Sequence, residues 1–397
     1  MIPGRVKILC FADTRFPIER ANGVQTMATC RALAARGHDV TLVTRPDTAP
    51  VARDPFAFYG EPAAPTLRFL TIPSPAGLRA RRARFLLSAL GIARRQADAI
   101  VYTRDLGLAA LLLRVPLTRR GGLVYESHGV SAVVAEEMPR LLGNPQATAS
   151  ARKLSRLDRR ERRVWRHARA VITVTRGLAA DLEARHGNRS GVFVVPDGAR
   201  MDAPLPPPAP GHPPVAGYAG HLYPWKGVDV LVRAVALASG IRGLIIGGHP
   251  QEEDRGRVER LASDLGVNGR ITFAGLLKPG DVRGVLGGAS LLVLPNTATA
   301  ISERYTSPLK LFEYLTTGRP IVASDLPAIR EVLTNGETAL LVPPGDAEAL
   351  AAALARLAGD QALQARLGAA ARALAADYSW DARAARLEAV LAGVSGS

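Results

Sequence analysis

The chain has 397 residues, which suggests two domains at a usual size of about 100–200 residues each. Apolar residues make up 47% and charged residues 22%, so the composition excludes disorder along the whole chain and allows a large core. The only two cysteines, Cys10 and Cys30, exclude a disulfide framework and a zinc site of four cysteines.

The formal net charge of +16 is unevenly distributed. Residues 1–200 hold 33 Lys and Arg against 16 Asp and Glu, whereas the rest of the chain holds 18 against 19. A genome rich in arginine codons would raise the number of arginines in both halves alike. We therefore expect the first half to meet something anionic, which leaves a membrane surface, a phosphorylated substrate and nucleic acid open.

The first residues, MIPGRVKILCFAD, contain no long apolar segment followed by a cleavage site. No apolar run approaches the roughly 20 residues that a membrane helix needs. We therefore expect a cytoplasmic protein with buried thiols. Its arginine-rich N-terminal half leads us to expect peripheral contact with the inner face of the membrane.

The first half repeats a pattern of apolar strand, polar loop and helix. The opening unit is a strand at Val6–Asp13, a helix from about Gly23 to Arg36 and a strand at Asp39–Thr44. The strands are apolar runs rather than alternating ones, which predicts a parallel sheet covered by helices on both faces. The later predicted strands of this half are Leu67–Ile72, Ala99–Asp105, Gly122–Gly129, Ala170–Gly177 and Val192–Gly198.

A proline-dense stretch, Ala203–Pro214, predicts a stiff connection between two domains. A second series of strands and helices follows it. We therefore place an N-terminal domain at residues 1–202, with a last helix at about 379–393 packed back on it, and a C-terminal domain at residues 203–378. The predicted strands of the second series are Val215–Gly220, Gly243–Gly248, Arg270–Leu277, Leu291–Asn296, Pro320–Asp325 and Ala339–Pro344, and its main helices are Lys226–Ala238, Pro308–Thr317 and Ala347–Leu357.

Two doubly wound domains predict a cleft between their sheets, with ligands beyond the carboxyl ends of the strands. Polar residues follow many of the predicted strands, so we expect the functional groups among them. These residues are Tyr102–Asp105, Glu126–His128, Thr175–Arg176, Asp197–Gly198, His221, Gly247–Gly248 and Asn296.

The segment SERYTSPLKLFEYLTTGRPIVASDLP, residues 302–327, is the most informative part of the chain. Ser307 and Pro308 are predicted to begin a helix whose first amides can hold a phosphate, and Lys310 adds charge in the same turn. Glu313 lies further along the helix, where its carboxylate can accept hydrogen bonds from ribose hydroxyls. The alternative is an ordinary capped helix with a solvated Lys and Glu.

The segment GYAGHLYPWKGVDVLVRA, residues 217–234, places Lys226 at the predicted start of a helix. A cation there opposes the helix dipole, so its presence favours a bound diphosphate. A solvated Lys is the alternative.

These residues resemble the family 4 retaining glycosyltransferases, which have the GT-B fold. The resemblance covers nearly the whole chain and is strongest over Gly217–Pro344. It rests on the order and spacing of several pieces rather than on any one of them. These pieces are Asn22–Gly23, Arg31–Thr44, Val194–Gly198, Lys226–Leu231, Ser307–Leu315 and Asn335–Asp346.

The resemblance implies α/β architecture with two Rossmann-like domains, and transfer of a sugar from a nucleotide donor with retention at the anomeric carbon. The resemblance further implies that the donor, which is a substrate, binds to the C-terminal domain and that the acceptor binds to the N-terminal domain, and no cofactor or metal is expected. Uridine is the expected base, by its frequency in the family. The implied roles are diphosphate binding by Lys226, ribose binding by Glu313, phosphate binding by Ser307, Pro308, Leu309 and Lys310, approach of Gly23 from the other domain, sugar contact by His128, and a base resting near Gly275 and Leu276.

Two positions depart from the family pattern. The arginine usually found five residues before Lys226 is His221, so that residue or Arg304 is expected to supply the second cation. The first Glu of the usual Glu-x7-Glu pair is replaced by Tyr305, eight residues before Glu313, although a subset of the family carries the same Ser-Pro-x-Lys-x-x-Glu-Tyr form. These departures bear on sugar recognition more than on the fold.

Two basic stretches bear on the acceptor. Ala151–Ala170 carries nine Lys and Arg against two acids, with Leu154, Leu157, Val164 and Trp165 on one helical face. Leu78–Arg95 carries six Arg and no acid, and such basic amphipathic segments can lie on anionic membranes. The acceptor is therefore expected to be lipid-linked or otherwise anionic, with a small natural product as the alternative.

Other functions stay open. A nucleotide-sugar 2-epimerase shares the fold and donor, but it needs acidic groups in the cleft, for which only Glu126 and Asp105 stand out. A basic protein that binds nucleic acid or a membrane surface would explain the charge, but no nucleic-acid motif is present, so specific nucleic-acid binding is not expected. A dehydrogenase is disfavoured because no G-x-G-x-x-G follows the first strand.

Overall fold

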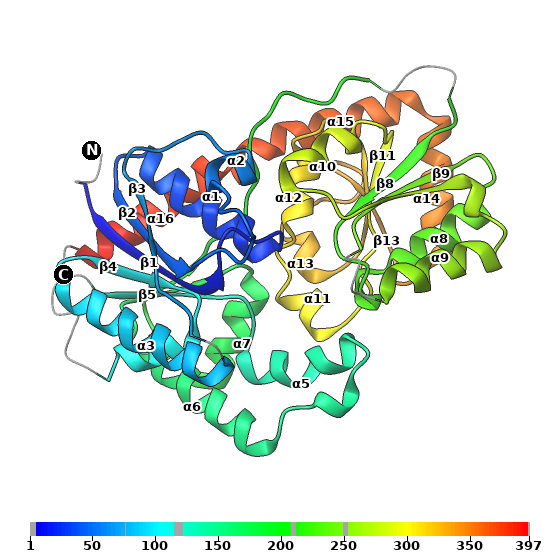
Figure 1. Ribbon diagram of the computed structural model, residues 1–397. Helices are drawn as coiled ribbons and strands as arrows, with labels where there is room; N and C mark the ends of the chain where they lie inside the picture. Colours follow the sequence, from blue (N-terminus) through cyan, green and yellow to red (C-terminus); the bar gives the residue numbers. More distant parts are fainter. Residues whose placement is uncertain (1–4, 76, 115–121, 208–211, 249–252, 396–397) are drawn as a thin grey trace. The chain divides into compact units, whose positions relative to one another are not determined.

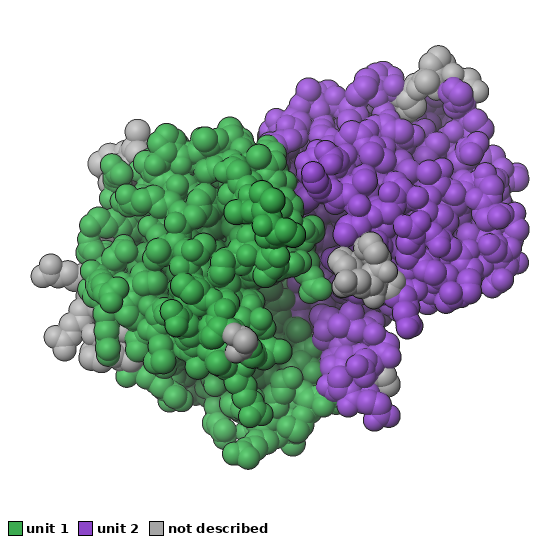
Figure 2. Space-filling model, in the orientation of Figure 1, with its two compact units in different colours: residues 1–137, 148–196, 380–397 green, residues 138–147, 197–379 purple. Residues whose placement is uncertain are grey.

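The structure is a computed structural model that describes residues 5–75, 77–114, 122–207, 212–248 and 253–395. It forms two compact units, coloured separately in Figure 2. Unit 1 comprises residues 1–137, 148–196 and 380–397, and unit 2 comprises residues 138–147 and 197–379. The chain thus passes into unit 2 at Asp197, ahead of the boundary that the proline-dense stretch predicts at residue 203. Residues 208–211 of that stretch lie outside the described residues.

Unit 1 is built on a seven-stranded sheet in which every pairing is parallel. The strand order is β3-β2-β1-β4-β5-β6-β7, so the direction of winding reverses between β1 and β4. Loops diverge at such a point and leave a crevice, which makes it the expected place for a ligand. The strands are β1 (Lys7–Arg15), β2 (Asp39–Arg45), β3 (Leu67–Thr71), β4 (Ile100–Thr103), β5 (Leu123–Ser127), β6 (Ala170–Thr173) and β7 (Val192–Val194).

Helices flank this sheet, as Figure 1 shows. Several begin at a capping side chain that accepts a hydrogen bond from the first turn: Asp54, Asp105, Ser150 and Thr175 each do so. The described helices are α1 (Ala21–Ala35), α2 (Pro55–Tyr59), α3 (Leu78–Arg95), α4 (Leu106–Leu112), α5 (Ser131–Leu141), whose last residues count with unit 2, α6 (Ala151–His167), α7 (Arg176–His186) and α16 (Trp380–Ser395).

The last helix, α16, belongs to unit 1 although unit 2 precedes it in the chain. Arg36, which follows α1, donates to Glu388 and Asp381 of α16. The imidazole of His38 lies 3.0 Å from the other Glu388 oxygen. These contacts fix α16 beside α1 and the start of β2.

Unit 2 has a six-stranded parallel sheet in the order β10-β9-β8-β11-β12-β13. Its winding reverses between β8 and β11. Its core lies on both faces of the sheet, where buried aliphatic side chains of strands and helices pack together. The strands are β8 (Val215–Ala219), β9 (Arg242–Ile246), β10 (Ile271–Gly275), β11 (Leu291–Leu294), β12 (Ile321–Ser324) and β13 (Leu340–Val342).

The predicted helices of unit 2 are present, with ends that differ from the predicted ones by up to two residues. The helix predicted from Lys226 begins at Val228, because Pro224–Lys226 forms a short 3-10 turn and Gly227 follows it with a φ of 69°. The helix predicted from Pro308 begins at Leu309. The helices are α8 (Val228–Leu237), α9 (Asp254–Asp264), α10 (Pro279–Leu286), α11 (Ala300–Arg304), α12 (Leu309–Leu315), α13 (Pro327–Arg330), α14 (Ala347–Gly359) and α15 (Gln361–Leu374).

Among the residues described, no helix is both long enough and apolar enough to cross a membrane.

Candidate functional site

In unit 2, Lys310 reaches from α12 to the carboxyl end of β8. Its Nζ donates a 2.8 Å hydrogen bond to the hydroxyl of Tyr218 and lies 4.2 Å from the centre of that ring. The Tyr218 hydroxyl in turn donates to the carbonyl oxygen of His221 at 2.6 Å. The ammonium group of Lys310 therefore lies at the end of β8, whereas the sequence placed it only in the first turn of α12.

Gly220 makes room for this ammonium group. A Cβ at that position would lie 2.3 Å from the Lys310 Nζ, and the φ of 145° is one that other residues rarely adopt. The end of β8 therefore has to be a glycine for Lys310 to occupy its place.

Lys226 lies on the same edge of the sheet, at the end of the 3-10 turn. Its Nζ lies 3.5 Å from the centre of the Trp225 ring, which is a cation–π contact. Burial, followed by the positive charge of Lys310, lowers the pKa of Lys226 well below its ordinary value. Burial also lowers the pKa of Lys310 to about 7, although Glu313 acts in the opposite direction. Two ammonium groups thus lie close together at a cost that a bound anion would offset.

Glu313 lies one turn after Lys310 on α12. Burial raises the pKa of its carboxyl group, and the charges of Lys310 and Arg283 oppose that shift. Its position agrees with the predicted one, near the lysines but further along the helix.

The residues before α12 are arranged differently from the prediction. The Ser307 hydroxyl accepts a 3.0 Å hydrogen bond from the backbone N–H of Asp197. Pro308 occupies the N-cap position and has no N–H to offer, so the first helical amide is that of Leu309. The short helix therefore presents fewer amides than the sequence predicts.

The ends of β9 and β10 are close to each other. Gly247 donates to the carbonyl oxygen of Gly275 at 2.8 Å, and Gly275 has a φ of 72°. A Cβ on Gly275 would lie 3.3 Å from a terminal nitrogen of Arg255 on α9. Leu276, next to it, is exposed. Arg255 is a neighbour of the predicted base position that the sequence did not single out, since its segment carries no motif.

Asn296 follows β11 and is fully buried. Neither atom of its side-chain amide has a hydrogen-bond partner among the described residues, and the same holds for the indole nitrogen of Trp225. The sequence marked Asn296 only by its place at a strand end. Unpartnered buried amides are rare, and a bound ligand or water at this strand end would satisfy the one of Asn296.

The two predicted substitutes for the missing arginine, His221 and Arg304, come from different elements of unit 2. The His221 ring stacks on Tyr223 with ring centres 4.8 Å apart and planes 5° apart. Arg304 ends α11, and Tyr305 after it is buried.

In unit 1, a pocket of about 290 Å³ lies at the point where the winding of the sheet reverses. It is bounded by the ends of β1, β4 and β5 and by α1. Its described lining is Cys10, Phe11, Ala12, Asp13, Thr14, Asn22, Gln25, Thr26, Thr29, Cys30, Leu42, Tyr102, Thr103, Arg104, Asp105 and His128.

A buried carboxylate, Glu126, lies behind the pocket wall and contacts two of the lining residues, Gln25 and His128. Its Oε1 accepts from the Gln25 amide at 2.7 Å and lies 2.5 Å from Nε2 of His128, while its Oε2 accepts from Arg383 at 2.7 Å. Burial opposes ionisation, but Arg383 and His128 outweigh it and hold the pKa of Glu126 below its ordinary value. Because a carboxylate can only accept, Nε2 of His128 carries a hydrogen.

The same network also orients the guanidinium group of Arg104, which lines the pocket. Gln25, whose amide donates to Glu126, accepts a 2.6 Å hydrogen bond from Arg104 through its oxygen. Tyr102 also lines the pocket, and its buried hydroxyl has no hydrogen-bond partner among the described residues. The sequence pointed to Arg104 and Tyr102 by strand-end position, whereas Gln25 lies on α1 and carried no such signal.

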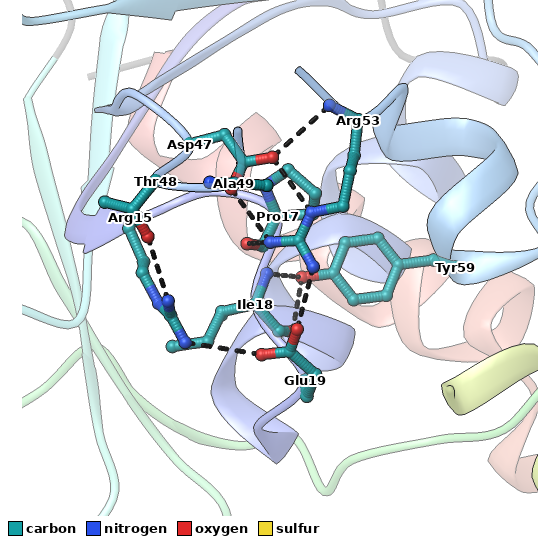
Figure 3. A network of polar contacts seen from close by, with 9 residues as sticks. All are labelled: Arg15, Pro17, Ile18, Glu19, Asp47, Thr48, Ala49, Arg53 and Tyr59. Carbon is teal, nitrogen blue, oxygen red and sulfur yellow. Dashed lines mark hydrogen bonds and ion pairs between the residues drawn. The ribbon is translucent and has the colours of Figure 1, made fainter. Parts of the chain in front are cut away.

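Gly23 lies in the first turn of α1, beneath the loop that enters the helix. A Cβ there would come within 2.5 Å of both the Ile18 side chain and the Tyr59 hydroxyl. Figure 3 shows how Tyr59 holds that loop: its hydroxyl accepts from the Ile18 N–H and donates to the Ile18 carbonyl, both at 2.8 Å. The predicted glycine is therefore required by packing within unit 1.

Arg53 completes the same network in Figure 3. It donates to Asp47 and Glu19 at 2.8 Å each and to the carbonyl oxygen of Pro17 at 3.0 Å. The hydrogen bond from Arg53 lowers the pKa of Asp47, and Arg53 also helps to lower that of Glu19 against the effect of burial. The loop before α1 is thus fixed by a charged cluster around one guanidinium group.

No group of three or more His, Cys, Asp or Glu within the described ranges is arranged to hold a metal ion.

Both halves of the chain match known protein families. Residues 22–198 match the family described as "Glycosyl transferase 4-like domain", and residues 213–360 match "Glycosyl transferases group 1". The chain is 30% identical over 240 residues to a D-inositol 3-phosphate glycosyltransferase of Nocardia farcinica, which covers 55% of this chain and 51% of that protein. It therefore spans about half the length of that relative.

A second relative is the lipopolysaccharide core biosynthesis glycosyltransferase LpsE of Rhizobium meliloti. It is 28% identical over 278 residues, which cover 67% of this chain and 75% of that protein. Among solved structures, the sucrose-phosphate synthase of Thermosynechococcus elongatus superposes with a TM-score of 0.76 at 22% identity, covering 96% and 97% of the two chains. HepE of Anabaena, solved with UDP and glucose, superposes with a TM-score of 0.73 at 18% identity, covering 96% and 98%. The two parallel sheets are those of the GT-B fold.

Proposed function

We propose that this chain, which belongs to the glycosyltransferases of the GT-B fold, moves a sugar from a UDP-sugar to a hydroxyl group of an acceptor with retention at the anomeric carbon. Unit 2 binds the donor and unit 1 binds the acceptor. No metal takes part.

The observation that carries this proposal is the pair Lys226 and Lys310. Their ammonium groups sit at the carboxyl edge of a parallel sheet, and each has its pKa lowered by burial. A diphosphate placed there would offset the burial and the mutual repulsion of the two cations, so both groups would carry full charge in the complex. Such a site binds the leaving group more strongly as its negative charge grows.

Negative charge develops on the diphosphate when the bond between the sugar and its phosphate oxygen breaks. Positioned cations that stabilise this charge supply much of the rate in such reactions. Lys226 and Lys310 provide that stabilisation, which is the role of a metal ion in other transferases. Glu313, further along α12, accepts from the ribose hydroxyls, and Ser307 and Leu309 contribute at the distal phosphate.

The acceptor reacts on the face that the phosphate leaves. Its hydroxyl oxygen forms the new bond to the anomeric carbon, and its proton passes to an oxygen of the departing phosphate, so no protein base is needed. His128 contacts the transferred sugar, and its orientation is set by the 2.5 Å contact with Glu126.

The two carboxylates that an epimerase would need are already engaged. Glu126 is enclosed by Arg383, His128 and Gln25, and Asp105 pairs with Arg82 and caps α4. This arrangement favours transfer over epimerisation.

The proposal is tested by incubating the protein with UDP-glucose, UDP-galactose and UDP-N-acetylglucosamine and following release of UDP. Slow donor hydrolysis or transfer is expected with one of them, and it should be lost in Lys226→Ala. Equal release in the wild type and in that variant would contradict the assignment.

Contact with a membrane surface has support from α3. The helix carries six arginines and no acid, and Leu78 in its first turn is 77% exposed. A basic helix of this kind is attracted to an anionic bilayer, where a lipid-linked acceptor would be found. Cosedimentation with phosphatidylglycerol vesicles at physiological salt tests this, and it should weaken in the double variant Arg79→Gln/Arg84→Gln, which removes two exposed charges.

A further inference from the structure

A cluster of guanidinium groups lies beside the pocket of unit 1, at the first turn of α4. Arg82 comes from α3 and Arg160 from α6. A Cβ placed on Gly107 would lie 2.6 Å from Nη2 of Arg82 and 3.8 Å from Nη1 of Arg160. The two side chains therefore converge on one spot from two different helices.

The two guanidinium groups differ in their partners. Arg82 binds Asp105 at 2.5 and 2.6 Å and also contacts Asp13, which is paired with Arg45 at 3.0 Å. Both aspartates line the pocket, and both are neutralised by these arginines. Arg160 makes no hydrogen bond or ion pair with any residue in the described part of the chain.

Positive charge is in excess around Arg160. Burial lowers its pKa, and the like charges of Arg156, Arg114 and Arg82 lower it further, while Asp105 alone acts in the opposite direction. Arginines crowded in this way repel one another, and an anion bound among them would remove that cost.

We propose that Arg160, with Arg82 beside it, binds a phosphate group of the acceptor, whose hydroxylated body occupies the adjoining pocket. The planar fork of a guanidinium group can bind two oxygens of a phosphate at once. A pocket of about 290 Å³ suits a single sugar or cyclic polyol, and the unpartnered hydroxyl of Tyr102 lies within it. This inference rests on the proposed function, because it names the class of acceptor: a phosphomonoester of a polyol or sugar.

Glycerol 3-phosphate is a suitable probe, titrated by calorimetry at constant ionic strength. We expect binding that becomes roughly tenfold weaker in Arg160→Gln, the loss of one charge-assisted contact. The matched control is Arg159→Gln, which removes the same charge from an exposed neighbour on the same helix and should leave binding unchanged. Since Arg160 has no partner among the described residues, its replacement should leave the fold intact, and circular dichroism checks this.

Two further measurements distinguish a lipid phosphate from a free one and separate this site from the donor site. Vesicles with and without phosphatidic acid show whether the phosphate can come from a lipid, and retention that depends on Arg160 but not on Arg159 would support the site with a lipid source. The inference is overturned if neither probe binds, or if Arg159→Gln weakens binding as much as Arg160→Gln. A parallel titration with UDP reports on unit 2 alone, so failure here with normal UDP binding leaves the proposed function standing.

Discussion

Arg383 and Glu126 form an ion pair of 2.7 Å with both side chains fully buried in unit 1. Arg383 lies on α16, near the end of the chain, and Glu126 lies on β5, two residues before His128. Arg383 also donates to the carbonyl oxygens of Val195 and Pro196. The last helix is thus joined to the strand whose end carries a predicted site residue.

Removing one partner of this pair should be costly. Arg383→Met removes the buried guanidinium group that pairs with the Glu126 carboxylate, and we expect a loss of about 3–5 kcal/mol in the free energy of unfolding of unit 1. Glu126 has a lowered pKa in the folded chain, so the stability that its ionisation provides is present above the ordinary pKa of a glutamic acid and is lost as the pH falls through the folded value. Urea unfolding at pH 7 and pH 4 measures both effects. A loss below 1 kcal/mol at pH 7 would contradict the account.

Lys226→Met should raise stability and abolish donor binding. The variant replaces a half-buried ammonium group near Lys310 with an apolar side chain of similar length, so we expect about 1 kcal/mol of added stability at pH 7. The pKa of Lys226 in the folded chain lies below its ordinary value, so keeping this group charged lowers the stability of the folded wild type at pH 7. This loss of stability becomes smaller as the pH rises towards 10.5, and the difference in stability between the variant and the wild type should shrink with it. Thermal unfolding with and without UDP measures this. A variant that is less stable and still binds UDP would count against the site.

Donor binding should weaken as the pH rises above 7. Free Lys310 has a pKa of about 7, and a bound diphosphate favours its charged form, so binding takes up a proton above that pH. The groups that face it are Tyr218 on β8, Glu313 on α12 and Lys226 on the neighbouring turn. We expect UDP affinity to fall between pH 7 and pH 9, with a smaller slope in Lys310→Met. Calorimetry in buffers of different ionisation enthalpy counts the protons.

Gly227→Ala should destabilise unit 2. The new Cβ would lie 1.8 Å from the carbonyl oxygen of Pro295, and the φ of 69° is unfavourable for alanine. We expect a cost of at least about 2 kcal/mol and weaker UDP binding, because this glycine connects Lys226 to α8. Gly240→Ala is the control, since no atom lies within 4 Å of its new Cβ. Hydrogen exchange of peptides from both units would locate the effect, and equal stability of the two variants would contradict it.

Much of the fold follows from the sequence because parallel strands covered on both faces read as apolar runs. Each predicted strand is present, although most end sooner than predicted, since the polar residues at their ends belong to loops. The helix at Lys226 was predicted two residues too early, because a 3-10 turn and a left-handed Gly227 precede it, and this glycine lies against the Pro295 carbonyl, which is far along the chain.

Contacts between residues that are far apart in the chain could not be predicted from the sequence. Lys310 was expected at the start of its own helix, but its ammonium group meets Tyr218, 92 residues earlier. Gln25 carried no signal because its role depends on Glu126 and Arg104, which the sheet brings to it. Arg160 was one of many arginines on α6, and only the fold shows that it faces Gly107 and Arg82.

The central claim is that unit 2 binds a nucleoside diphosphate through Lys226, Lys310 and Glu313. The most direct measurement is calorimetric titration of UDP, GDP, TDP and ADP into the wild type, Lys226→Ala and Glu313→Ala. We expect UDP to bind the wild type more tightly than the other three, with at least tenfold weaker binding in both variants. No binding of any nucleotide at millimolar concentration, or equal binding in the wild type and the two variants, would contradict the claim.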